Sequence, residues 1–246
     1  MGFRDNYNRR INGNTGGSGK LGDAYKNNTD KFINATFDSS PNFRVMEVVS
    51  TEFPTITTID GRVMLVERLG SLREVAFRPN EGLNVGVYVK FDGETWLIVD
   101  KWGSRQERMN VLVQKCNSRL KWKDQANITR TLDCIVSAMP VGSKANQGDN
   151  DIEWNKYDVR LPTGNMFAFV EANALTRTLF LNQRFIFDKK AYEVYGIDET
   201  TYTDKNGYGM IQLTLKKTTI MPEKDDLTYE IAFNSYGSGA TGGRLW

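Results

Sequence analysis

The sequence predicts an all-β fold in which two tandem, small β-barrel-like units follow an N-terminal arm and a short helix. Three observations predict it. Beyond Pro41, apolar and polar residues alternate in short runs that glycine, proline and Asx turns interrupt. A hairpin and the strand after it occur twice along the chain. The 246 residues suffice for two units of about 100 residues each.

The N-terminal part differs from the rest in composition. Residues 1–21 are polar and rich in Asn, Arg and Gly, so they cannot bury enough apolar surface to fold alone. A helix is expected over residues 23–37, because Asp23 can cap it and several apolar side chains fall near one stripe. The residues before Pro41 should end this helix. The stripe consists of Tyr25, Phe32, Ile33 and Phe37.

The first β-hairpin is expected at residues 87–99. Residues 87–91 alternate between the two faces of a strand, and Asp92-Gly93 is a strong hairpin turn. An apolar run then begins at Thr95. After a polar loop, residues 111–116 should form the next strand of the same sheet.

The same pattern recurs in the second half. Residues 185–194 align with residues 89–98 without a gap, at an offset of 96, and a later run at residues 211–215 matches the third strand after a loop four residues longer. Any two hairpins with an Asx turn look alike, but three strands in the same order favour a duplication. Each unit should then be a strongly curved sheet or partly closed barrel, which removes exposed strand edges. The matched turn and aromatic positions are Asp92 with Asp188, Phe91 with Phe187 and Trp96 with Tyr192.

These patterns divide the chain into four parts. Residues 142–150 are polar and should be an exposed loop or linker before the repeated hairpin of the second unit. The expected domains are an arm and helix (1–40), a first β-barrel unit (41–125), a second β-barrel unit (126–236) and a Gly-rich C-terminal tail (237–246).

Charge and hydropathy restrict the partners. The chain has 32 Lys and Arg against 30 Asp and Glu, a net formal charge of +2, so it exerts no long-range attraction on nucleic acid or an anionic membrane. It has no run of about 18 apolar residues, and its first residues lack the apolar region of a secretory signal. We therefore expect a protein made in the cytoplasm, without a membrane partner.

The absence of histidine argues against most catalytic sites. Histidine is the commonest general base near neutral pH and the commonest metal ligand. A carboxylate-dependent hydrolase of cell-wall glycan remains an alternative, but Asp149, Asp151 and Glu153 lie in a linker-like segment that does not hold carboxyl groups at a fixed separation. We expect no catalytic residue, cofactor or metal, hence no enzyme. Cys116 and Cys134 should be buried apolar fillers.

One segment has the composition of an interaction site. Residues 101–130 hold eight basic residues against two acidic ones, with Trp102 and Trp122 between them. Basic and aromatic side chains together can form a groove for single-stranded nucleic acid. The residues expected to face such a partner are Trp102, Arg105, Arg108, Lys121 and Lys123.

Two other interpretations of this segment remain open. The basic residues can lie on a solvated strand face while the tryptophans fill the core. Alternatively, the basic edge can meet an acidic edge of the next subunit head to tail in a ring. Residues 81–100 provide that acidic edge, because they carry Glu81, Asp92, Glu94 and Asp100 against only Lys90.

Several short sequence motifs also resemble those of a known family. They are the YNRR arm at 7–10, the helix at 26–34, the Ser39-Ser40-Pro41 break, the runs at 77–81, 115–122 and 182–187, and the Gly-rich end. Together they resemble uncharacterised structural proteins of long-tailed phages. We expect the genes of these proteins to lie among those for head-to-tail joining. These motifs belong to strands and turns, so the resemblance assigns no functional-site residue to this sequence.

The resemblance implies a virion protein of the neck, similar to the head-closure (stopper) proteins whose small β-barrels form rings. Its expected partners are a homo-oligomeric ring, the portal or adaptor, and the tail terminator or tail tube, with packaged DNA passing through the channel. Simple stoppers have one barrel, whereas this chain is doubled. A tail-tip, baseplate or tail-tube-associated structural protein therefore remains an alternative, as does a nucleic-acid-binding module.

Overall fold

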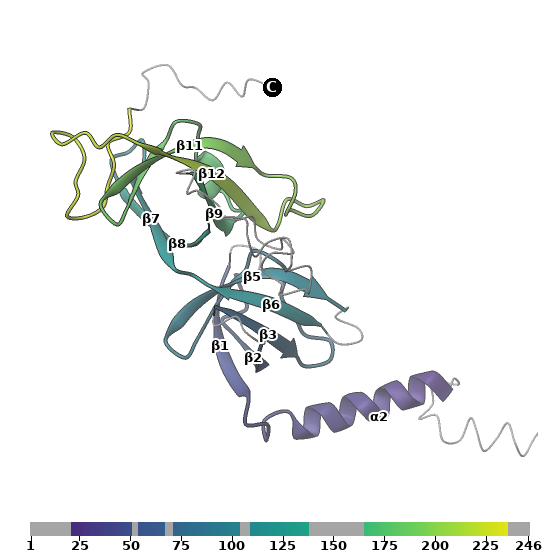
Figure 1. Cartoon of the computed structure of the whole chain (residues 1–246). Helices are drawn as coiled ribbons and strands as arrows, with labels where there is room; N and C mark the ends of the chain where they lie inside the picture. Colours follow the sequence, from purple (N-terminus) through teal and green to yellow (C-terminus); the bar gives the residue numbers. More distant parts are fainter. Residues whose placement is uncertain (1–20, 51–53, 67–70, 104–108, 138–164, 236–246) are drawn as a thin grey trace, which may run out of the picture.

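The computed structural model describes residues 21–50, 54–66, 71–103, 109–137 and 165–235. Within them, one α-helix precedes two six-stranded units that lie in tandem (Figure 1). This confirms the nearly all-β fold of two barrel-like sheets that the sequence predicted. The helix α2 spans Leu21–Thr36. No helix within the described residues is both long and apolar enough to cross a membrane.

The first barrel is a closed sheet with the strand order β1-β2-β3-β6-β5-β4. Its interior holds the aliphatic and aromatic side chains of one core cluster, including Met46, Phe77, Ile98 and Val113. The strands are β1 (Phe43–Val49), β2 (Thr58–Leu65), β3 (Leu72–Phe77), β4 (Tyr88–Phe91), β5 (Glu94–Trp102) and β6 (Asn110–Lys115).

The second barrel repeats this order as β7-β8-β9-β12-β11-β10. A separate core fills it, with Trp122, Phe185 and Leu213 among its buried side chains. Its strands are β7 (Ser118–Lys123), β8 (Thr129–Ser137), β9 (Asn165–Glu171), β10 (Arg184–Phe187), β11 (Lys190–Asp198) and β12 (Met210–Thr218), and a short 3₁₀ turn, η2 (Thr176–Thr178), follows β9.

The two hairpins match in detail. The register shifts between Ile98 and Asp100 in one and between Val194 and Gly196 in the other, which is the same position at the offset of 96. The turn residues Asp92 and Asp188 both have a left-handed backbone, with φ of 51° and 47°. The sequence repeat is therefore a repeat of strand order, bulge and turn.

One detail of the predicted repeat was wrong. Trp96 pairs with Lys115, whereas its counterpart Tyr192 pairs with Lys217. The connection in the second barrel is therefore six residues longer, not four. Side chains alternate with a period of two, so a shift of two residues leaves the same set facing inward and the pattern could not detect it.

The strand pairing places the boundary between the units earlier than residue 125. β7 pairs with β8 in the second sheet, so the chain passes from one barrel to the other at residues 116–117. The expected boundary followed the polar turn after Lys123, but that turn joins β7 to β8. The passage itself contains no glycine or proline that could have marked it.

The barrels are packed together through a third apolar cluster. Tyr88, Leu97 and Val99 of the first barrel contact Phe169 and Met210 of the second. We call this contact the junction. Tyr88 is buried there, and its hydroxyl donates to the Asp133 carbonyl at 2.7 Å and accepts the Glu171 N–H at 3.3 Å.

Cys116 packs against this junction, and Cys134 lies in the neighbouring core of the second barrel. Cys134 is buried in the second core, Cys116 is half-buried, and both thiols are free. Asn117, the residue after Cys116, donates its N–H to the Cys134 carbonyl at 3.2 Å. Burial, assisted by the charge of Asp133, raises the pKa of Cys116 to about 12. Burial also raises the pKa of Cys134 well above its ordinary value.

We therefore expect both thiols to be inert in the folded protein. Only the thiolate reacts, and at pH 8 a thiol with a pKa near 12 has roughly a thousandfold less thiolate than free cysteine. Titration with a disulfide reagent should modify both thiols rapidly in urea and slowly without it. Rapid modification of the native chain would contradict the burial described here.

Candidate interaction surfaces

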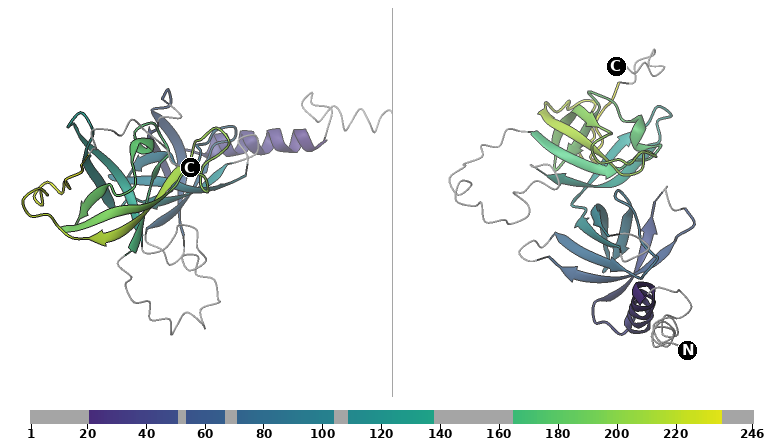
Figure 2. Two further views of the ribbon diagram at one scale, coloured as in Figure 1. Left: turned by 90° about the horizontal axis from the view of Figure 1, so that it is seen from above. Right: turned by 90° about the vertical axis from the view of Figure 1, so that its right-hand side faces the viewer.

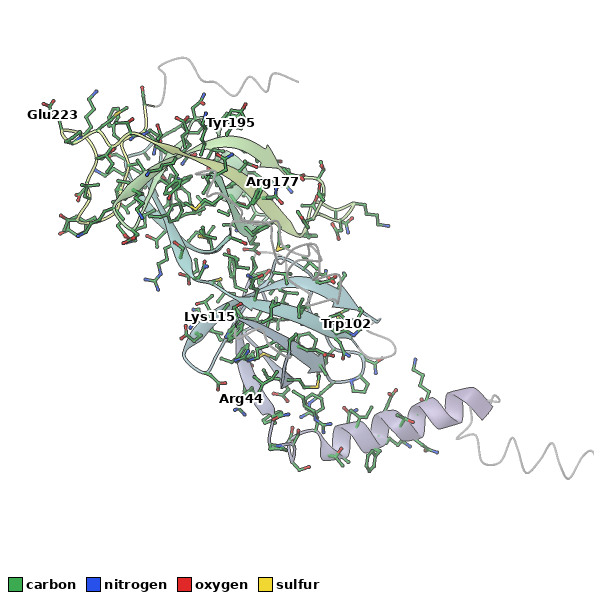
Figure 3. The ribbon with its side chains drawn as sticks, in the orientation of Figure 1. Arg44, Trp102, Lys115, Arg177, Tyr195 and Glu223 are labelled. Carbon is green, nitrogen blue, oxygen red and sulfur yellow. The ribbon has the colours of Figure 1, made fainter. Side chains whose placement is uncertain are left out.

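The structure separates the residues predicted to form a nucleic-acid groove. Trp102 lies at the end of β5 on the edge of the first barrel, where 42% of it is exposed (Figure 3). Lys121 and Lys123 lie on β7 of the second barrel. Arg105 and Arg108 fall outside the described residues. Trp102 and the two lysines therefore do not lie on one barrel.

The other tryptophan of the segment is part of the core. Trp122 is 1% exposed, and its ring meets that of Phe185 edge to face at 6.1 Å between centroids. It cannot stack on a base without unfolding the second barrel. Lys121 beside it forms an ion pair with Glu230 at 2.8 Å. β7 thus has a core face that contains Trp122 and a more accessible face that contains Lys121 and Lys123.

Two of the expected acidic-edge residues are paired within the first barrel. Asp92 lies 2.9 Å from Arg44, and Glu94 lies 2.7 Å from Lys115. Both pairs are exposed, and exposed pairs contribute little to stability. Asp100 accepts the N–H of Lys101 at 2.7 Å. Glu81 differs from these three because it lines a depression in the surface.

That depression, which we call the first-barrel hollow, has a volume of about 460 Å³. Ile56 and Ile59 provide its apolar part, and Asp60 and Glu81 provide two carboxylates. Asp60 accepts two hydrogen bonds from Arg78, at 3.0 and 3.1 Å, whereas Glu81 is exposed at the surface. The remaining lining residues are Thr58, Asn80 and Gly82.

The root of α2 is fixed to the first barrel by two arginines and one phenylalanine. Arg62 donates to the carbonyl oxygens of Thr36 (2.7 Å) and Phe37 (3.3 Å), and Arg78 donates to that of Asn34 (3.3 Å). The ring of Phe37 is fully buried, with the Arg62 and Arg78 guanidinium carbons 4.6 and 4.5 Å from its centroid. The arginines therefore satisfy carbonyls that a helix end leaves open.

Charge also holds this root together. Arg78 forms ion pairs with Asp60, at 3.0 Å, and with Asp38. Burial alone would lower the pKa of Arg78, but its hydrogen bonds and the negative charges of Asp60 and Asp38 outweigh burial and raise the pKa. Arg78 therefore stays charged while it bridges the helix end and the barrel wall.

Beyond its root, α2 leaves the barrel. Figures 1 and 2 show the helix projecting away from both barrels. Side chains at residues 26–36 are exposed or half-buried, and Phe32 is 69% exposed. The helix itself was predicted correctly, although it begins at Leu21 rather than at Asp23. Within the expected stripe, Phe37 is buried, Ile33 is half-buried and Phe32 faces solvent.

The second barrel also differs from the first in how its sheet closes. The ladder between β1 and β4 closes the first barrel, whereas within the described residues no ladder joins the equivalent strands β7 and β10. We call the facing edges of β7 and β10 the seam. Residues 219–235, which we call the C-terminal segment, contact both edges.

Arg184 is the centre of that contact. Its guanidinium binds both carboxylate oxygens of Asp225, at 3.0 and 2.9 Å, and the Asp225 side chain is fully buried. The Asn234 side chain accepts the N–H of Arg184 at 2.6 Å and donates to its carbonyl at 3.0 Å, as a neighbouring strand would. Glu230 reaches Lys121 on the other edge.

Asp225 also organises the C-terminal segment itself. Its carboxylate accepts the backbone N–H groups of Met221 (2.7 Å) and Phe233 (2.9 Å). Burial raises the pKa of Asp225, but the hydrogen bonds from Arg184, Met221 and Phe233 outweigh burial, and the pKa lies below its ordinary value. Asp225 is therefore a charged, fully bonded group that ties the C-terminal segment to β10.

The described residues contain no group of three or more Cys, Asp or Glu side chains that could hold a metal ion. The trio Asp149, Asp151 and Glu153 lies outside the described part of the chain. The features that the structure does bring together are thus the projecting helix, the first-barrel hollow, the junction and the covered seam.

Comparison with known proteins gives one family match. The model of the YomX C-terminal domain matches residues 118–216, the second barrel from the start of β7 almost to the end of β12. This is a phage-derived family, and the match indicates a phage protein. No curated protein matches the sequence.

Among solved structures, a similar chain is that of "MrkH, A novel c-di-GMP dependence transcription regulatory factor". The identity is 7%, the alignment covers 80% of this chain and 85% of that chain, and the TM-score is 0.21. A likeness of this degree carries no argument about the present chain.

Proposed function

We propose that the chain is a structural, non-enzymatic component of a tailed-phage virion. In this proposal it forms a ring in the neck, as a head-completion or stopper protein, and joins the portal or adaptor to the tail terminator or tail tube. The observation that carries the proposal is the match of a phage-derived family to the second barrel. The resemblance of the sequence to structural proteins of long-tailed phages supports the same assignment.

The geometry suits a joining protein. The junction unites the two barrels through an apolar cluster and the hydrogen bonds of Tyr88, so they can act as one body. The helix projects from this body and is fixed at its root by Arg62 and Arg78. A rigid body with a projecting element can make contacts on two sides at once, which a ring subunit requires.

Location in the particle tests the proposal. A phage carrying a short epitope on this chain should yield virions that contain the chain and bind the antibody between head and tail. Without the chain, infected cells should accumulate filled heads and separate tails. Antibody bound at the distal end of the tail would instead favour the tail-tip alternative, and virions that lack the chain altogether would refute a structural role.

A further inference from the structure

We infer that α2 of one copy packs on the first barrel of the next copy, with Phe32 entering the first-barrel hollow and Lys31 facing Glu81. The inference rests on the proposed ring and names the contact that would build it. The donor and acceptor surfaces differ, so the contact is of the head-to-tail kind that closes into rings.

The first argument is that the described side chains of α2 have little support beyond its root. At 16 residues the helix is about 24 Å long, and isolated helices of this length are marginal in water. Its sequence includes Gly22, Asn27, Asn28, Thr29 and Asn34, which are poor helix formers. Most helical stability in proteins comes from packing an apolar face, yet the side chains of residues 26–32 are exposed, except for half-buried Asp30. We therefore expect a further surface to cover the exposed side of the helix.

The second argument is the direction of the helix. Arg62 and Arg78 hold the final carbonyls of α2, and the buried ring of Phe37 lies between them. The root is therefore fixed, and the rest of the helix points away from both barrels (Figures 1 and 2). Phe32, just before the root, is presented to a neighbour.

The third argument is complementary chemistry. The first-barrel hollow has a mainly polar lining, and half-buried Ile56 provides the apolar surface that a phenylalanine ring could cover, whereas Ile59 behind it belongs to the barrel core. Asp60 is paired with Arg78, which it shares with Asp38, so the exposed Glu81 is the carboxylate of the hollow that a cation can reach. Lys31 is exposed and precedes Phe32, about 100° around the helix axis, and its long flexible side chain can reach Glu81 when the ring lies in the hollow. A second copy of the chain supplies both the Phe32 ring and the Lys31 ammonium group.

Charge reversal tests the inference sharply. Lys31→Glu and Glu81→Lys should each weaken association of the full chain at least about tenfold, because each places like charges face to face. The double variant should associate as the unaltered chain does. Mixing the two single variants in equal amounts should also restore association, since alternating copies then present opposite charges at every contact.

Mass photometry and light scattering at low salt would measure these states, with circular dichroism to verify folding. Phe32→Ser should weaken association without altering either barrel. Lys205→Glu, which reverses an exposed lysine in a turn of the second barrel, is the matched control and should have no effect.

Three results would overturn the inference. They are an unaltered chain that stays monomeric at its highest soluble concentration, single variants that associate normally, and single variants that neither the double variant nor the mixture rescues. The location of the chain in virions is measured separately, so the proposed function can stand when this contact fails.

Discussion

Replacing Asp225 by alanine should lower the free energy of unfolding of the second barrel by about 3 to 5 kcal/mol. The substitution removes one member of a buried ion pair and leaves the Arg184 guanidinium, which is only 9% exposed, without its counter-charge. It also leaves the N–H groups of Met221 and Phe233 without their acceptor.

Urea denaturation followed by circular dichroism would measure the loss. Glu223→Ala is the matched control, because Glu223 is an exposed carboxylate two residues away in the same segment (Figure 3). That substitution should change stability by less than about 0.5 kcal/mol. If Asp225→Ala costs no more than Glu223→Ala, the C-terminal segment is not held to β10 by this pair.

The pH dependence of the free energy of unfolding should also show that Asp225 stabilises the fold in its charged form. The pKa of Asp225 is lower in the folded chain than its ordinary value, so its stabilisation is fully present above the ordinary value. It is lost as the pH falls through the lowered value, because the folded state must then take up a proton that the unfolded state already holds. The unaltered chain should therefore lose more stability in acid than Asp225→Ala does.

The sequence predicted what depends on local pattern. The helix, the hairpin turns at Asp92 and Asp188, and the duplication follow from residues close in the chain, because turn chemistry and alternation are local. The burial of Trp122 could also have been predicted, because Trp122 lies two residues from Leu120 and faces inward with it. Trp102 lies at a strand end, where alternation no longer determines burial.

What the sequence could not provide are the contacts between distant residues. Arg184 and Asp225 are 41 positions apart, and each lies in a stretch that looks like surface: the start of a strand and a charged turn. Nothing in the sequence around Arg62 and Arg78 indicates that these arginines bind the end of a helix. The junction depends on two glycines more than 100 positions apart, and only the three-dimensional structure brings them together.

Substitution of one of these glycines should have the second large effect on stability. Gly86 and Gly209 lie back to back at the junction, with φ of 91° and 144°. A Cβ at Gly86 would lie 1.8 Å from the carbonyl oxygen of Gly209. Neither backbone can move freely, because Gly86 donates to the Ile98 carbonyl at 2.8 Å and the Gly209 carbonyl accepts from Ala172 at 2.8 Å.

Gly86→Ala should therefore separate the barrels and cost about 3 kcal/mol or more. The control is Gly93→Ala, because Gly93 has a similar φ of 78° but a Cβ there would meet nothing within 4 Å. Lys189 occupies the matching turn position in the second barrel with φ of 59°, so a side chain is tolerated in that conformation. The control should cost only about 1 to 2 kcal/mol, which is the strain of the left-handed backbone alone.

Comparing the two variants separates backbone strain from collision. Urea denaturation would give both costs, and hydrogen exchange would show whether amides around Tyr88 and Phe169 lose protection in Gly86→Ala alone. Equal costs for the two substitutions would mean that the barrels can move apart slightly without penalty. A much larger cost at Gly86 would establish that close backbone contact, beyond the apolar side chains, fixes one barrel against the other.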